Sequence, residues 1–321
     1  MPDLNIGGQA VIEGVMMRSP DRVATAVRVP SGEILVKIQP YRSLTKKYKA
    51  LGIPIVRGAV AFVEMMILGI KTLNFSAEIA MSELEKEEAA KSGKAVGERK
   101  SQNSLYVALS AVAALGLGIL LFFFTPLALA NLLHIEKDAL EFNLLAGAIR
   151  LTMFVLYVWG ISFFGEFKRI FQYHGAEHKS IYAYEMGEDL TPDRAALHTR
   201  FHPRCGTSFI LIVALLAIMI YAISDTLYAV WTGHPPSLLA RFGVHFSLLP
   251  LVAGTSFELL KLSGKTRDNA VTKVLIQPGL WLQKITTKEP SREQLEVAIA
   301  ALEASLGVTE SRLTSKVTAL S

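Results

Sequence analysis

The sequence predicts a mainly α-helical integral membrane protein with about four transmembrane helices, a small N-terminal β-structure and a C-terminal cytoplasmic helix. Of its 321 residues, 51% are hydrophobic and only 19% are charged, against about 25% charged residues in an ordinary soluble domain. The mean hydropathy is +0.37, and the apolar residues gather in long runs separated by polar segments. This composition is typical of a protein that crosses a bilayer several times.

The charge and cysteine content exclude two other classes of protein. The formal net charge of +5 comes from basic residues that are scattered and are not interleaved with aromatic residues, so we expect no nucleic-acid partner. The only cysteine, Cys205, has no partner for an internal disulfide, so disulfides do not support the fold.

Residues 1–45 form the first predicted unit, an N-terminal β-hairpin region. Two runs rich in valine and isoleucine flank the segment from Pro30 to Glu33, whose proline, serine and glycine favour a tight reversal of the chain. The preceding "GGQAVIEGVMMRSP" predicts a glycine-permitted turn that leads into a half-buried strand, with a binding loop as the alternative.

Residues 46–103 predict a long amphipathic helix and a polar linker. Within the helix expected over 53–90, charged residues recur at seven-residue intervals from Arg57 to Glu85, and the other positions are largely apolar. A charged stripe that drifts slowly around a helix is typical of one that lies against a membrane or against other helices. The pattern leaves open whether 53–75 crosses the bilayer, re-enters it or lies on it.

Residues 104–265 predict a four-helix membrane domain. No Asp, Glu, Lys or Arg occurs between Lys100 and Glu136, and this run is long enough to cross a hydrocarbon core of about 30 Å. The other candidate spans are at about 143–165, 207–231 and 242–262. Arg150 interrupts the second span, and we expect it to pair with Glu141 or to reach the lipid headgroups.

The loops between the spans predict the orientation. Basic residues are frequent before the first span, in the loop 166–206 and after the fourth span, whereas the two other loops contain only Lys137 and Arg241. By the positive-inside rule, both termini and the loop 166–206 lie in the cytoplasm.

Residues 266–321 form the predicted C-terminal cytoplasmic segment. Ser291 is followed three residues later by Gln294, which is the signature of a capping box at the start of a helix. Leu295, Ile299 and Leu302 then line one helical face.

The loop 166–206 holds most of the candidate metal ligands. Histidines at 174, 178, 198 and 202 lie in it, together with the only cysteine. On a helix, His174, Glu177 and His178 share one face, because residues three and four positions apart are neighbours. Two imidazoles one turn apart, with a carboxylate beside them, can bind one metal ion. The order His-x-x-Glu-His is that of the inverzincin metalloproteases.

A second cluster supplies the remaining ligands. His202 and Cys205 stand at the start of the third span, and Pro203 favours a turn that opens a helix there. A thiol near a helix N-terminus is tipped towards the thiolate, which is the form that binds metals. The expected metal ligands are His174, His178, His202 and Cys205. The expected metal is divalent, with zinc first and iron or manganese as alternatives, and His198 is the reserve ligand.

Two carboxylates are candidates to act on this site. We expect Glu177 to be the catalytic base, because a further acidic group would be redundant in a closed tetrahedral site. Glu258 lies near the cytoplasmic end of the fourth span, where an unpaired carboxylate is costly. It would orient a ligand histidine, bind the metal itself, or pair with Lys261 or Arg267. The alternative for the histidines is that they are solvated near the headgroups.

Five segments together resemble the YqhQ-type bacterial membrane proteins. They are "GGQAVIEGVMMRSP", "YHGAEHKSIYAYE", "FHPRCGTSF", "AGTSFELLKL" and "PGLWLQKITTKEP". The resemblance runs from Gly7 to about Leu302 and implies a bacterial cytoplasmic (inner) membrane. The family carries the label of a predicted metal-dependent enzyme, which names no substrate. The resemblance implies one shared site, formed by His174, Glu177, His178, His202 and Cys205.

The expected function is that of a membrane-embedded metal-binding protein, and more specifically of a metal-dependent hydrolase. It would use a metal-activated water, with Glu177 as base, on a substrate in or near the membrane. The alternative is a non-catalytic scaffold or assembly factor whose structural metal site fixes the loop between the second and third spans. A transporter is disfavoured, since the spans contain few ionisable groups and no paired broken helices. The expected partners are the lipid bilayer, a membrane-proximal substrate or protein, and a second copy of the chain.

Overall fold

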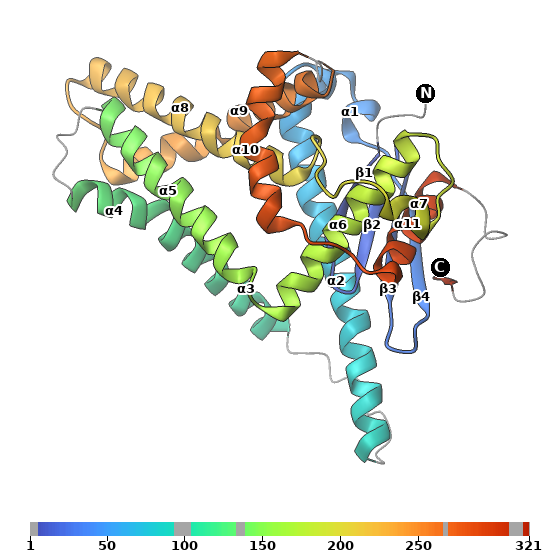
Figure 1. The fold of residues 1–321 in the computed structure, drawn as a ribbon. Coiled ribbons are helices and arrows are strands. Elements are labelled where there is room, and N and C mark those ends of the chain that lie inside the picture. Colours follow the sequence, from blue (N-terminus) through green and yellow to red (C-terminus); the bar gives the residue numbers. More distant parts are fainter. Residues whose placement is uncertain (1–5, 93–103, 133–138, 266–268, 308–316, 321) are drawn as a thin grey trace.

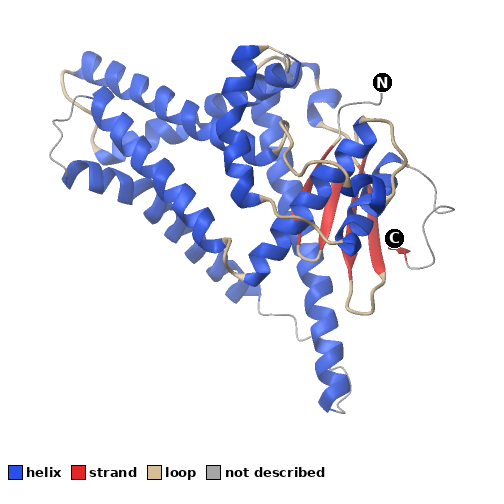
Figure 2. Ribbon diagram, viewed as in Figure 1, coloured by secondary structure: helices blue, strands red, loops and turns tan. Residues whose placement is uncertain are grey.

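The computed structural model of the chain describes residues 6–92, 104–132, 139–265, 269–307 and 317–320. Within these ranges the protein is mainly helical, with a bundle of apolar helices on one side and a small helix-covered sheet on the other (Figures 1 and 2). The predicted fold class is therefore confirmed.

Four helical stretches are long and apolar enough to cross a membrane, so the chain is a membrane protein. They are Val112–Ala130, Glu141–Ile161, Phe209–Thr232 and Leu238–Ser263. The first runs through α3 (Ser104–Ile119), the π-helical turn η2 (Leu120–Phe124) and α4 (Thr125–Leu132). The others belong to α5 (Ala139–Ile161), α8 (Gly206–Thr232) and α9 (Leu238–Lys265). Each lies where the sequence predicts a span.

Arg150 has a different partner from the two expected for it. Its Nε donates a hydrogen bond to the carbonyl oxygen of Phe122 in η2 at 2.7 Å, and its guanidinium lies 5.7 Å from the ring centroid of Phe123. A π-helical turn interrupts the regular i→i−4 hydrogen bonding of a helix. Arg150 therefore binds a backbone carbonyl of the first span, rather than Glu141 or the headgroups.

The sheet is a meander with one added strand. β1 (Gly7–Val11), β2 (Gly14–Arg18), β3 (Arg22–Arg28) and β4 (Ile34–Pro40) pair antiparallel in chain order, and β5 (Val317–Leu320) pairs parallel with β4. The predicted hairpin is confirmed: Arg28 pairs with Ile34, and Gly32 in the turn has a φ of +87°. That left-handed conformation favours glycine.

Helices cover both faces of the sheet. α2 (Val56–Ser92) packs on one face, and α6 (Gly165–Glu185) and α11 (Arg292–Leu306) pack on the other. Side chains of β2 alternate between the two cores, with Val15 and Met17 towards α6 and α11 and Met16 towards α2, as the two-residue period of a strand requires. The predicted capping box of Ser291 and Gln294 is present at the start of α11.

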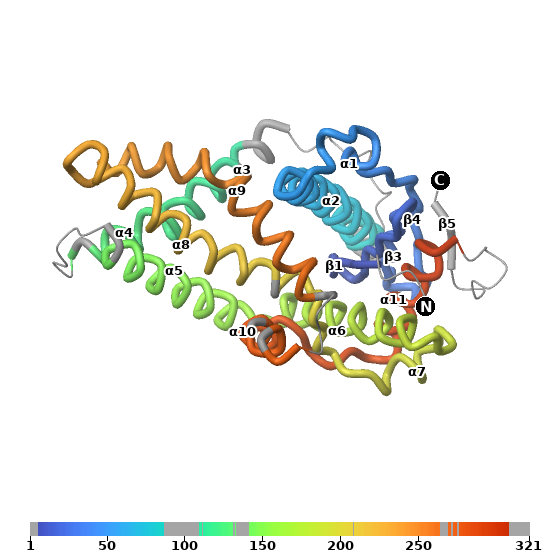
Figure 3. Tube along the Cα trace, turned by 90° about the horizontal axis from the view of Figure 1, so that it is seen from above, coloured from blue at the N-terminus to red at the C-terminus, as the bar shows by residue number. Residues whose placement is uncertain are grey.

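The remaining helices connect the bundle to the sheet. α10 (Ala270–Thr286) packs against α8 and α5, and α7 (Pro192–Ala196) packs against α6 and α11. α1 (Leu44–Lys47) and the 3-10 turn η1 (Lys49–Gly52) lead into α2. Figures 1 and 3 show α2 at the junction between the bundle and the sheet, running across the direction of α8 and α9. The loop 166–206, which contains α6 and α7, lies at the same junction.

Candidate metal centre

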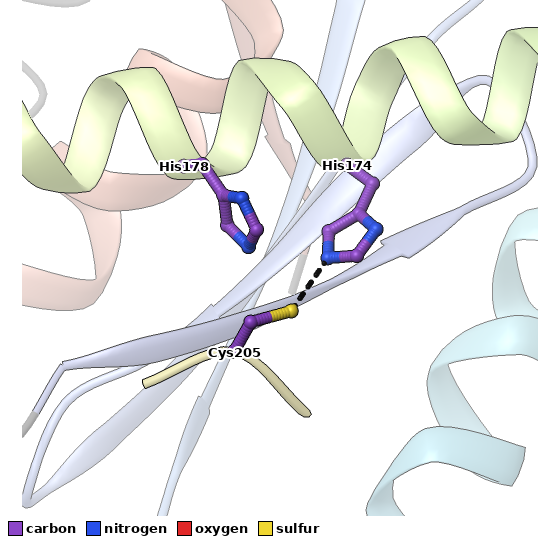
Figure 4. A group of neighbouring side chains, drawn as sticks. All are labelled: His174, His178 and Cys205. Atoms are coloured by element: carbon purple, nitrogen blue, oxygen red, sulfur yellow. Dashed lines mark hydrogen bonds between the residues drawn. The ribbon is translucent and has the colours of Figure 1, made fainter. Parts of the chain in front are cut away.

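Three side chains with metal-binding atoms converge at this junction. His174 and His178 project from one face of α6, one turn apart, and Cys205 faces them as the N-cap of α8 (Figure 4). Their ligand atoms all lie within 4.8 Å of one another. Within the group, His174 Nε2 lies 3.1 Å from Cys205 Sγ. The expected histidine pair and the expected thiol therefore share one site.

Backbone carbonyls fix which nitrogen of each imidazole faces this site. His174 Nδ1 lies 2.8 Å from the carbonyl oxygen of Thr286, and His178 Nδ1 lies 2.6 Å from that of Arg200. A carbonyl oxygen only accepts hydrogen bonds, so each Nδ1 carries a hydrogen and each Nε2 is left for the site. Histidines that bind metals are held in this way by hydrogen bonds from their second nitrogen.

His178 Nε2 has no hydrogen-bond partner within the described ranges. The side chain is almost fully buried, with an exposed fraction of 1%. A buried polar atom without a partner costs about 1–3 kcal/mol. Its place opposite Cys205 makes a metal ion a fitting partner, because a metal would take the lone pair that no neighbouring donor uses.

The three groups alter one another's protonation. Burial alone would raise the pKa of the Cys205 thiol, but the imidazoles of His174 and His178 hold that pKa well below its usual range. Burial alone would lower the pKa of His174, but the sulfur of Cys205, together with Glu177, raises it to about 9. The two imidazoles therefore favour the thiolate form of Cys205, the form in which cysteine binds metals.

Glu177 lies beside the three candidate ligands and is not part of the converging group. It is 5% exposed, and this burial raises the pKa of its carboxyl against the opposing effect of His178 and His174. The backbone N–H of Gly8 in β1 donates a hydrogen bond to it. A Cβ at Gly8 would lie 2.9 Å from Glu177 Cγ and Cδ, so glycine is the residue that leaves room for this carboxylate. A raised pKa suits a general base that works near neutral pH.

His202, the fourth expected ligand, lies next to His174, His178 and Cys205, but its ring faces a different side chain. Its ring centroid is 5.6 Å from that of His178, but its Nε2 faces Glu185 Oε1 at 3.5 Å. Gln283 of α10 donates to the carbonyl of His202 and accepts from its N–H, each at 2.8 Å. His202 is therefore held at the edge of the site, where a rotation of its ring would be needed to bind a shared ion.

Two other candidates lie outside the group. His198 Nε2 lies 3.2 Å from Glu188 Oε2. Glu258 accepts two hydrogen bonds from the Arg57 guanidinium, at 2.7 and 2.5 Å. This ion pair joins α9 to α2. Glu258 was expected to orient a ligand histidine, to bind the metal or to pair with a basic residue, and the structure places its carboxylate in an ion pair away from the candidate metal ligands. The partner Arg57 comes from a helix distant in sequence and was not predicted, and Arg267, one of the partners expected, lies outside the described residues.

A short segment after α10, residues 286–290, crosses α6 over the site. Lys288 N donates to the carbonyl of Phe171 at 2.8 Å. A Cβ on Gly175 would lie 2.1 Å from the carbonyl oxygen of Lys288. The glycine between the two ligand histidines therefore permits this close approach, and the crossing brings the Thr286 carbonyl to His174.

A buried charged cluster in the membrane bundle was not anticipated. Asp225 of α8 accepts a hydrogen bond from Asn143 of α5 at 2.9 Å, and it faces Arg241 and His245 of α9 at 3.0 and 2.9 Å. All four side chains are buried, and Tyr221 stacks on His245 with ring centroids 4.1 Å apart. Asp225 is the only carboxylate in the third span, and the sequence alone shows this. Its partners could be identified only from the packing of the helices.

Comparisons with known proteins show which family the chain belongs to. The family model described as "Protein of unknown function (DUF1385)" matches residues 53–308, a range that includes the three converging ligands. The "Uncharacterized protein YqhQ" of Bacillus subtilis (strain 168) is 37% identical over 307 residues, which cover 91% of this chain and 89% of that protein. No solved structure matches the chain. The chain is thus a member of the DUF1385 family, and the resemblance to YqhQ-type proteins is confirmed.

Proposed function

We propose that the protein is a metal-dependent enzyme of the bacterial cytoplasmic membrane, with the metal held by His174, His178 and Cys205. The observation that carries this proposal is the common orientation of the two imidazoles. Backbone carbonyls hold both Nδ1 atoms, and both Nε2 atoms are left for a site that also contains the sulfur of Cys205, whose pKa is lowered. Two imidazoles and a thiolate suit zinc first, with iron or manganese as alternatives.

The number of ligands favours a catalytic site over a closed one. Three protein ligands leave one position of a tetrahedral site for water or substrate. When bound, the metal would supply Lewis-acid activation of a water molecule. Glu177, buried beside the ligands, is then placed to accept the proton of that water. The reaction class is hydrolysis, and peptides, lipid headgroups and phosphoesters are the candidate substrates.

The proposed topology puts this chemistry at the cytoplasmic membrane face. Cys205 caps the helix that becomes the third span, so the site adjoins the bilayer. The positive-inside rule assigns this end of the spans, and both termini, to the cytoplasm. A substrate in or near the membrane, or a partner protein there, would then reach the site from the cytoplasmic side.

A specific observation supports the second candidate, a scaffold or assembly factor with a structural metal. The ligands come from α6 and α8, and the end of α10 orients one of them, so a metal would tie these helices together. With a rotated His202 as the fourth ligand, the site would be closed and have no position for substrate.

The first experiment is a measurement of metal content by mass spectrometry on protein purified without chelator. We expect about one equivalent per chain in the wild type, as one tetrahedral site implies, and its loss in both His178→Ala and Cys205→Ser. His198→Ala, in the same loop but outside the group, is the matched control and should retain the metal. A wild-type protein without bound metal would overturn the proposed metal site.

Cobalt(II) substitution then separates the enzyme from the scaffold without knowledge of the substrate. An open coordination position binds small anions such as azide, which changes the visible spectrum of the cobalt, whereas a closed four-ligand site does not respond. We expect a response in the wild type and in Glu177→Gln, because Glu177 is not a ligand. A spectrum that is insensitive to anions until His202→Ala is introduced would favour the scaffold.

A further inference from the structure

One face of α2 carries a row of exposed apolar side chains, here called the α2 band. It consists of Phe62, Val63, Met66, Ile67, Ile70 and Leu73, with exposed fractions from 37% to 55%. Their spacing of one, three and four positions puts them on one side of the helix. Contiguous apolar surface of this kind is rare on a soluble domain and marks a contact with a membrane or with another protein.

The other sides of α2 are already occupied. Leu68, Thr72 and Ser76 are buried towards the sheet. Glu64 lies on a third side, where its carboxylate accepts hydrogen bonds from the hydroxyl of Tyr41 at 3.0 Å and the N–H of Leu44 at 2.6 Å. The band is therefore the side of α2 that neither the sheet nor the preceding segment covers.

The α2 band begins beside the start of the third span and close to the end of the fourth. The ring of Phe62 lies 6.0 Å from that of Phe209, the first residue of the third span. A Cβ on Gly58 would lie 2.7 Å from Phe257 Cβ in the fourth span. α2 is thus fixed against the ends of both spans, and Figure 1 shows it running across their direction. The first side chain of the band, Phe62, therefore adjoins the third span at its start.

We propose that α2 lies in the plane of the membrane surface, with the α2 band covered by the acyl chains of the adjoining leaflet. α2 does not cross the bilayer, because its buried side carries the sheet, whose loops and turns are polar and belong in water. A helix with one apolar side, one charged side and a soluble domain behind it is typical of an interfacial helix.

The charge of the segment before α2 favours a bilayer, rather than a second copy of the chain, as the partner that covers the α2 band. The segment just before α2 contains basic residues and no acidic residue between Tyr41 and Val56. The basic residues are Arg42, Lys46, Lys47 and Lys49. An anionic leaflet attracts such a segment, whereas a second copy would bring a segment of the same sign. A second copy would also have to displace the lipid that surrounds α8 and α9.

The placement of α2 can be tested on the full-length protein in nanodiscs of anionic phospholipid. Nitroxide labels are attached to Met66→Cys and Ile70→Cys in the band, and to Lys71→Cys on the charged side as the matched control. The wild type, labelled in parallel, corrects for Cys205, which is only 5% exposed. Electron paramagnetic resonance then compares relaxation by oxygen, which partitions into lipid, with relaxation by a water-soluble nickel complex.

We expect the oxygen-to-nickel ratio at positions 66 and 70 to exceed that at 71 several-fold. Equal access of the nickel complex to all three labels would overturn the proposal, because the band would then face water. Labels in the band that are shielded from both reagents and show spin–spin coupling between chains would overturn it in favour of a second copy. The placement of α2 does not depend on the metal centre, so the metal measurements leave it unchanged.

Discussion

Gly175→Ala is expected to weaken metal binding without touching a ligand. The new Cβ would lie 2.1 Å from the carbonyl oxygen of Lys288, about 1.3 Å short of an ordinary contact of 3.4 Å. The obstructing atom belongs to the backbone of residues 286–290, so it cannot rotate away as a flexible side chain would. Either this segment moves outward or α6 shifts, and in both cases the distance between Thr286 and His174 grows.

The size of the effect follows from the hydrogen bond that is lost. His174 Nδ1 lies 2.8 Å from the Thr286 carbonyl oxygen, and a displacement of about 1 Å takes the pair beyond the range of a hydrogen bond. Loss of a partner that orients a ligand typically lowers metal affinity 10–100-fold, which corresponds to about 1.4–2.8 kcal/mol. The added methyl group should also destabilise the metal-free protein by about 1–3 kcal/mol, as overpacking does.

The assay is a zinc titration in competition with a chromophoric chelator, followed by thermal unfolding with chelator present. Gly165→Ala is the matched control, because it lies at the start of the same helix and a Cβ there meets nothing within 4 Å. We expect the wild-type zinc affinity in Gly165→Ala and a weakened one in Gly175→Ala. Equal zinc affinity in both variants would refute the role assigned to residues 286–290.

Three further predictions concern protonation and the two ion-pair clusters. The pKa of His174 in the metal-free protein is raised to about 9, so a metal must displace its proton at neutral pH. Zinc affinity should therefore rise with pH up to about that pKa and level off above it. Calorimetry in buffers of different ionisation enthalpy should report proton release on zinc binding at neutral pH, and the absence of proton release would contradict the raised pKa of His174. Asp225→Asn removes the buried carboxylate that faces Arg241, so we expect the free energy of unfolding to fall by about 3–5 kcal/mol. The measurement is a lower melting temperature with an unchanged metal content. Loss of metal at an unchanged melting temperature would contradict this. In the Arg57–Glu258 pair both side chains are more than 20% exposed, so a double-mutant cycle should give a coupling free energy of about 1 kcal/mol or less. A loss of metal in Glu258→Ala would show that the carboxylate acts on the metal centre after all.

Much of the fold could be predicted because its elements follow simple periods. The apolar runs have the length of a bilayer, the hairpin has its turn residues, and α11 has a capping box, so each is encoded within a few tens of residues. The contacts between these elements join segments that are distant in sequence. The sheet is covered by α6 and α11, which come from the middle and the end of the chain, and no period in the sequence indicates that these segments meet.

In the candidate site, too, the features set by local sequence could be predicted and those set by the tertiary fold could not. The convergence of three candidate ligands could be predicted, because a helical turn sets the spacing of His174 and His178 and the turn at Pro203 makes Cys205 a helix N-cap. The carbonyl groups that orient the imidazoles could not be predicted, since every residue has one and only the tertiary fold selects Thr286 and Arg200. Asp225 and its partners were missed for the same reason: each residue was visible, but their meeting across three helices was not.

The position of Glu177 bears on the choice between an enzyme and a scaffold. In a closed structural site, a buried carboxylate that binds no metal would only destabilise the protein, because burial favours its neutral form. Yet β1 provides a glycine that leaves room for this side chain and a backbone N–H that binds it. Burial raises the pKa of this carboxyl, whereas the imidazoles of His178 and His174, together with the hydrogen bond from Gly8, stabilise its charged form. A carboxylate held between these two effects can accept a proton and give it up again, which is what a base in hydrolysis does and what a structural metal site does not require.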